Sequence, residues 1–111
     1  MGSLYRGSMS LLEIDDDNAK LRSAVISQIL NAVTDMMWLS SEQGSFLRKN
    51  MGNYNLLNAA QLLRVHNYIL MQGDRVIIPM QYAEDGVVLM LIQTPGRTAA
   101  GKIDANGSIH A

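Results

Sequence analysis

The amino-acid sequence predicts an α+β fold: a long amphipathic helix and a second, buried helix, followed by a small C-terminal antiparallel β-meander. As far as residue 71, apolar side chains recur at spacings of three and four, the period of an α-helix. From Asp74 onward, short β-branched or apolar runs alternate with turn residues, as in antiparallel strands. With 111 residues, 48% of them apolar and 17% charged, the chain is expected to form one folded domain.

The first residues are set apart from this domain. Residues 1–8, MGSLYRGS, are interpreted as the remnant of an expression tag, so the domain is predicted to span residues 9–111. Leu11, Leu12 and Ile14 stand just before a run of aspartates. We expect them to cover the first turns of the long helix as a hydrophobic staple. A short lead-in helix is an equal alternative.

The long helix is predicted over residues 18–43. On a helical wheel it carries two apolar seams: Val25, Ile29, Ala32, Met36 and Leu39 form one, and Ile26, Leu30, Val33 and Met37 form the other. Asn18 and the preceding aspartates are N-cap candidates, and Gly44 is the expected residue after the last turn. Together the seams cover about half of the circumference. The helix therefore needs cover from two directions, in its own domain or in an oligomeric bundle.

Trp38 falls on the polar arc of this wheel, outside both seams. One interpretation is that the C-terminal half of the chain covers it, or that the helix rotates there. The other is that Trp38 anchors a partner, because tryptophan is enriched at binding hot spots. Phe46, two residues past Gly44, is expected to fold back onto the last turn.

A connector is predicted over residues 45–55, which carry Gly52 and three asparagines. A second helix is predicted over residues 56–71, with Asn55 as its cap and Gly73 just beyond its end. Its apolar residues occur on nearly all sides, so we expect it to be buried on both faces. In the alternative, the helix gives way near His66 and residues 68–71 already form a strand.

The meander is predicted from its turns. Glu84-Asp85-Gly86, Pro95-Gly96 and Asn106-Gly107 punctuate the runs at residues 76–80, 87–92 and 99–104. Pro79 is expected on an edge strand or at a strand end, because proline cannot donate to the ladder. Residues 87–92 are apolar at every position, which predicts a strand covered by helices on one face and by a neighbouring subunit on the other.

No group of residues in the sequence points to catalysis. His66 lies on a mostly apolar helix, where a hydrogen-bonded structural histidine is expected, and His110 is one residue from the end. The acidic clusters at residues 15–17 and 84–85 are explained by helix capping and by a turn, and cysteine is absent. We therefore expect no enzyme activity, no metal site and no cofactor.

Charge and hydropathy exclude further classes. The net charge is −1 and the nine basic residues are scattered, which is unlike the footprint of a nucleic-acid-binding protein. No apolar run is long enough to span a bilayer, and no secretory signal pattern occurs, so we expect a cytoplasmic protein without membrane contact.

These patterns favour a non-enzymatic protein–protein interaction module: an assembly component, adaptor or chaperone-like regulator that forms a homo-oligomer through the apolar helix face and also binds another protein. The expected interface residues are Val25, Ile29, Ala32, Met36, Met37, Trp38, Leu39 and Phe46. The alternative is a DNA-binding transcriptional regulator, in which the connector and the second helix form a helix-turn-helix with Arg64, Asn67 and the Arg48-Lys49 pair near the groove. A small-molecule enzyme whose site is shared between subunits is the third alternative.

Overall fold

The structure, a computed structural model, describes residues 14–111 and has the predicted α+β architecture. Its elements, in chain order, are α1 (Ala19–Thr34), α2 (Ser41–Lys49), the 3-10 helix η2 (Met51–Leu56), α3 (Ala59–Gln72), β1 (Val76–Tyr82), β2 (Val88–Thr94), β3 (Arg97–Ile103) and β4 (Ile109–His110). The predicted tag remnant at residues 1–8 and the staple candidates Leu11 and Leu12 lie outside the described residues. Ile14 lies inside them and packs against the core.

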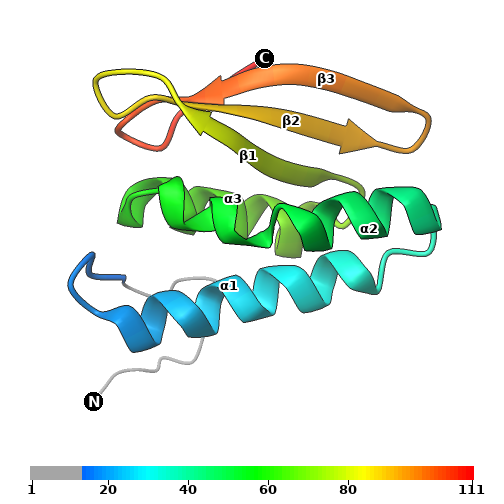
Figure 1. The fold of residues 1–111 in the computed structure, drawn as a ribbon, viewed down its shortest axis with the longest axis horizontal. Helices are drawn as coiled ribbons and strands as arrows, with labels where there is room; N and C mark the ends of the chain where they lie inside the picture. The colour runs from blue at the N-terminus through cyan, green and yellow to red at the C-terminus, as the bar shows by residue number, and fades with distance from the viewer. Residues whose placement is uncertain (1–13) are drawn as a thin grey trace.

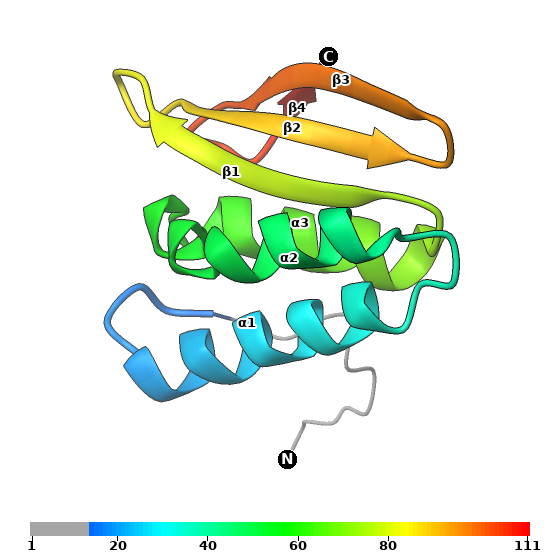
Figure 2. The same ribbon diagram turned by 45° about the vertical axis from the view of Figure 1, so that its right-hand side comes forward.

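The elements are stacked in layers (Figures 1 and 2). α1 forms one outer layer, α2 and α3 form the middle layer, and the sheet forms the other outer layer, with β1 as the strand nearest the helices. α3 contacts α1 on one side and β1 on the other. The second helix is therefore covered from two directions, as its apolar pattern predicts, and it is the helix around which the fold packs.

The first helix is shorter than predicted. Its N-terminus is as expected, because the Asn18 side chain accepts a hydrogen bond from the Leu21 amide at 3.0 Å. The prediction of one helix over residues 18–43 is wrong, since α1 ends at Thr34. A new helix begins at Ser41 because Ser40 and Gln43 cap it reciprocally, each side chain accepting from the other residue's backbone N–H at 3.1 and 2.7 Å. Gly44 consequently lies inside α2 instead of ending a helix.

The second long helix starts later than predicted, for the same physical reason. Asn58 and Gln61 form a capping box that places the first residue of α3 at Ala59, and the expected cap Asn55 lies inside η2. The predicted connector accordingly holds the second half of α2 and most of η2. The alternative of a strand over residues 68–71 is wrong, because they belong to α3. Gly73 ends the helix with a φ of 73°, as predicted.

Gln61 also ties α3 to the sheet. Its side chain is buried, and Nε2 donates to the carbonyl oxygens of Gly86 at 2.6 Å and Asp104 at 3.0 Å. Close by, Gly107 has a φ of 90°, and a Cβ there would lie 2.9 Å from the carbonyl oxygen of Ala60. The N-terminal end of α3 thus packs against two sheet loops, one of which requires a glycine.

A polar pair, a buried histidine and a partly buried glutamine, lies beside the core between α1 and α3. Val25, Ile29 and Val33 are the buried residues of α1. Beside them His66, which is also buried, has Nε2 3.0 Å from Gln28 Oε1. Burial lowers the pKa of His66, with the Asn67 side chain opposing this shift. The neutral ring can then donate from Nε2 to Gln28, which is the structural role expected for this histidine.

The sheet is an antiparallel meander in the order β1-β2-β3-β4, as predicted. Pro95 and Gly96 form the two-residue turn between β2 and β3, with Gly96 at a φ of 75°. In β2, Val88 and Met90 are buried, whereas Leu89, on the opposite face, is 38% exposed. The described residues therefore leave that face of β2 partly open, and its cover by a neighbouring subunit stays a prediction.

Pro79 lies on the edge strand β1, as expected, and side chains of η2 close this edge. The Tyr54 hydroxyl donates to the carbonyl oxygen of Ile77 at 2.8 Å, and Asn53 Nδ2 donates to that of Pro79 at 3.0 Å. Burial raises the pKa of Tyr54, so its hydroxyl keeps the proton that it donates. The two carbonyl groups that point away from β2 at these positions are thus paired.

Candidate functional site

The chain forms a sharp corner between α1 and α2, which we call the α1–α2 corner (residues 34–49). After Thr34 the backbone makes two turns, in which the Met36 amide donates to the carbonyl of Val33 at 3.1 Å and the Leu39 amide donates to that of Met36 at 3.2 Å. The Ser40 capping box then starts α2. Two helix ends and an irregular linker are therefore held against each other.

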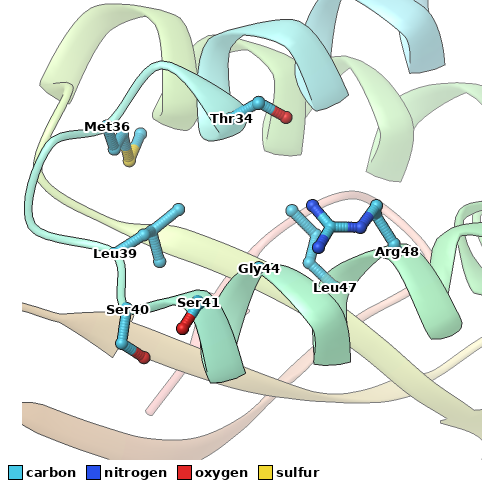
Figure 3. Close-up of a pocket in the computed structure, with 8 residues that line it drawn as sticks. All are labelled: Thr34, Met36, Leu39, Ser40, Ser41, Gly44, Leu47 and Arg48. Carbon is cyan, nitrogen blue, oxygen red and sulfur yellow. The ribbon is translucent and has the colours of Figure 1, made fainter.

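A pocket of about 360 Å³ lies inside this corner (Figure 3). Its lining combines apolar side chains, hydroxyl groups and one cation: Thr34, Met36, Leu39, Ser40, Ser41, Gly44, Leu47 and Arg48. Thr34 and Met36 border the gap on the side of α1, and Leu39 projects into it from the opposite side. Its volume is near the lower end of the range of about 300–1,000 Å³ for ligand pockets. One or two side chains of a partner would fit.

Glycine and arginine set the character of the wall that α2 contributes. A Cβ at Gly44 would lie 3.5 Å from Arg48 Nη1, which is an ordinary contact. The absence of a side chain at Gly44 therefore leaves space in the pocket, but no steric clash requires a glycine there. Arg48 is exposed, and its Nη2 donates weakly to Ser45 Oγ at 3.4 Å. None of the eight lining residues is acidic or a histidine. The arrangement suits binding of an apolar or uncharged group, and the lining offers no pair of groups for proton transfer.

The structure divides the eight predicted interface residues into two groups. Val25 and Ile29 are 0% exposed in the core beside α3, and Ala32 packs partly buried against the same core. These three side chains are covered by the chain itself and do not form a surface. The seam of α1 that was expected to face a partner faces α3 instead.

The other five belong to the α1–α2 corner. Met36 and Leu39 line the pocket, and Phe46 lines a second, shallower hollow on α2 together with Ser41, Glu42, Ser45 and Lys49. Met37, the residue after Met36, is 99% exposed. It is thus the most accessible of the predicted interface residues, and it projects from the linker.

Trp38 lies in the linker and not on a helix. It is partly buried and packs against the core, so the chain's own residues cover part of it. Its Nε1 is buried and has no hydrogen-bond partner among the described residues. Leaving such a donor unpaired costs about 1–3 kcal/mol.

Other candidate residues do not assemble into a site in the described part of the chain. His110, in β4, pairs with Asp104 of the loop before that strand at 3.1 Å. Residues 14–111 contain no group of three side chains that could hold a metal ion. None of the helices that the structure describes is long and apolar enough to cross a membrane.

The geometry gives the DNA-binding alternative no support. Arg64 is exposed on α3, but η2 separates α2 from α3 where a helix-turn-helix has a turn of three or four residues. α3 is also the middle helix, in contact with α1 and β1, so it could not enter a groove without uncovering the core.

A sequence signal for the corner does exist. Ser40 followed by Gln43 is the capping-box pattern, and it competes with the apolar period that continues through Met36 and Leu39. Arg48 and Gly44 join the pocket only because a helix starts there. Comparisons of the chain with known protein families, with curated proteins and with solved structures found no match.

Proposed function

We propose that this protein is a non-enzymatic, cytoplasmic protein–protein interaction module that self-associates through the α1–α2 corner. The observation that carries the proposal is a fully exposed methionine next in sequence to a residue that lines a pocket with both apolar and polar side chains in its wall. Met37 is 99% exposed, while Met36, Leu39 and Leu47 form apolar walls of the pocket. An adaptor or assembly component would use the same corner for a second protein.

The arrangement suits a symmetric dimer. In a two-fold interface the same surface meets itself, so a projection and a recess on one corner can each be used twice. Methionine is flexible and polarizable, and it fits irregular apolar recesses. We propose that Met37 of each copy enters the pocket of the other, where it contacts Met36 and Leu39 and stays clear of the Arg48 guanidinium.

Such a contact is expected to be weak. Stable interfaces bury about 1,200–2,000 Å² of accessible surface in total. An interface made by one linker residue per copy and its neighbours buries less surface than that. We therefore expect a reversible dimer, whose fraction rises with protein concentration and whose Kd lies in the range of about 10 μM to 1 mM.

The test is the average mass in solution, measured by sedimentation equilibrium over a wide range of protein concentration. The wild-type mass is expected to rise toward that of a dimer, and Met37→Lys is expected to stay monomeric, because it would bury an unpaired ammonium group in a pocket that the Arg48 guanidinium already lines. Met71→Lys is the matched control, since Met71 is 72% exposed on α3, outside the corner. A wild type that is monomeric up to about 1 mM, or a Met37→Lys variant that still dimerises, would refute the proposal.

A second variant separates loss of the pocket from loss of the fold. Gly44→Leu fills the pocket from the wall of α2, and it replaces a glycine in a helix interior, which by itself favours the helix by about 0.5–1 kcal/mol. We expect Gly44→Leu to unfold no more easily than the wild type and to dimerise at least about tenfold more weakly. Unchanged dimerisation would show that the pocket is not occupied.

A further inference from the structure

The α1–α2 corner carries two charged side chains that have no partner of opposite charge in the described part of the chain. Asp35, directly after α1, is exposed and forms no ion pair with another described residue. Arg48, in the last turn of α2, is exposed as well, and its guanidinium makes only the weak contact to Ser45 Oγ. One copy of the protein therefore presents a negative and a positive group at the same corner, and does not pair them with each other.

The position of Asp35 is unfavourable for the helix that it follows. Asp35 is the C-cap of α1, and the last turn of α1 contains no basic residue. The C-terminal end of a helix carries a partial negative charge, so a carboxylate there is repelled where a cation would be attracted. Asp15 differs, because its Oδ1 accepts the backbone N–H of Asp17 in the turn before α1. Local structure thus explains the carboxylate of Asp15 but not that of Asp35.

The dimer proposed above brings the two groups of the corner together. Met37 of one copy enters the pocket of the other, and Arg48 reaches that pocket from α2 (Figure 3). Asp35 comes two residues before Met37, and two residues span at most about 7 Å. When Met37 occupies the pocket, Asp35 of the same copy therefore lies near its rim, within reach of the long side chain of the other copy's Arg48. A two-fold axis makes this contact occur twice.

The charges of the corner favour a second copy of this chain as the partner. Residues 34–49 contain two acidic and two basic side chains: Asp35, Glu42, Arg48 and Lys49. Two copies can therefore meet at this corner without net repulsion, and each copy supplies both the carboxylate and the guanidinium that the other needs. Arginine and a carboxylate also match in hydrogen-bonding geometry, since the planar guanidinium can donate to both carboxylate oxygens.

We propose that Asp35 of each copy forms an ion pair with Arg48 of the other across the dimer interface. The inference rests on the proposed self-association through the α1–α2 corner and adds the residues that determine which surfaces meet. Exposed ion pairs contribute little affinity, whereas like charges placed opposite each other weaken binding. The two pairs therefore act mainly on specificity, while Met37 and the pocket supply the apolar contact.

The experiment reverses each charge separately and then mixes the two variants. Asp35→Arg places arginine opposite arginine at both contacts, and Arg48→Asp places aspartate opposite aspartate. Each variant alone is expected to dimerise at least about tenfold more weakly than the wild type by sedimentation equilibrium in about 50 mM salt. Their equimolar mixture is expected to form a heterodimer with a Kd within about threefold of the wild-type value, because both contacts then join an arginine to an aspartate. Recovery in the mixture also shows that both variants are folded.

Two control variants make the same changes in net charge outside the corner. Glu84→Arg lies in the turn between β1 and β2, and Arg64→Asp lies on α3, both at exposed positions. Each control is expected to dimerise within about threefold of the wild type, and mixing the two should not strengthen association.

The outcomes separate this inference from the proposed function. If the wild type dimerises and Met37→Lys does not, two results would overturn the ion pairs and leave the self-association intact. One is an Asp35→Arg variant that dimerises as the wild type does, and the other is a mixture with Arg48→Asp that stays monomeric. A wild type that is monomeric up to about 1 mM would overturn both proposals.

Discussion

The strands β1 and β3 both pair with β2, but the backbone groups that they direct away from β2 meet different surroundings. On β1, the carbonyl groups of Ile77 and Pro79 accept hydrogen bonds from Tyr54 and Asn53 of η2. On β3, the groups of Thr98 and Ala100 have no described strand opposite them, and β4 covers only the end of the strand. The comparison shows that the outward backbone groups of a strand find partners because of the element packed beside the strand, and depend less on the residues of the strand itself.

Proline scanning of β3 should give the largest effect in this comparison. Ala99 directs its N–H toward β2 and Ala100 directs its N–H outward, so Ala99→Pro is expected to lower the free energy of unfolding by about 3 kcal/mol and Ala100→Pro by less than about 1 kcal/mol. Urea denaturation measures both values. Equal losses would mean that the outer edge of β3 is paired after all.

Removing the hydroxyl that closes β1 should have the next largest effect. Tyr54→Phe leaves the buried carbonyl of Ile77 without its partner at 2.8 Å, and we expect a loss of about 1–3 kcal/mol in the free energy of unfolding. Tyr82→Phe is the matched control, because the Tyr82 hydroxyl is hydrogen-bonded to the Gly86 amide in an exposed place. A control that loses as much as Tyr54→Phe would contradict the role of burial at the β1 edge.

The second closing contact should be weaker. Asn53→Ala removes a half-buried amide that donates to the carbonyl of Pro79 at 3.0 Å, and the expected loss is about 0.5–1.5 kcal/mol by thermal or urea unfolding. Asn55→Ala, in the same 3-10 helix but exposed, should change stability by less than about 0.5 kcal/mol. If the two variants cannot be distinguished, Asn53 does not close the edge.

Lowering the pH should weaken the contacts that hold β4 beside β3. We expect this to be the smallest of the four effects. His110, and then the backbone amides of Ser108 and Asn106, lower the pKa of Asp104, the residue that holds the loop between β3 and β4. Because the pKa is lower in the folded state, this stabilisation is present above the unfolded pKa of about 3.9 and is lost as the pH falls through the folded value.

The protection factors of the Lys102 and His110 amides, which correct for the intrinsic exchange rate at each pH, should therefore fall below about pH 4 before those of the core amides do. In Asp104→Asn the protection of the same two amides should already be low at neutral pH. Protection at these two amides that is unchanged by acid, with the core intact, would show that Asp104 does not hold β4.

Local chemistry makes much of the fold readable from the sequence. The Asn18 cap, the glycine after α3 and the turns at residues 84–86, 95–96 and 106–107 depend on residues close in the chain. The break after Thr34 had a local signal too, in the Ser40–Gln43 capping box. The apolar period that continues through Met36 and Leu39 masked it, because periodicity is read over many residues and a cap over four.

The surfaces depend on residues that are far apart in the chain. Tyr54 and Ile77 are 23 positions apart, so no local pattern shows that one edge of the sheet is closed. The pocket likewise requires the end of α1 and one side of α2 to meet. Sequence patterns indicate that such groups need partners, but the packing of elements selects which partners they find.

The sequence by itself determined the fold class, helices followed by an antiparallel meander, and the fact that α1 must be covered. Only the tertiary structure decided what covers it. Burying an apolar seam stabilises the protein by roughly 25 cal/mol per Å² of apolar surface, whether the cover comes from the same chain or from another copy. Val25 and Ile29 pack within their own chain beside α3, and Met37, from the other seam, is left at the surface.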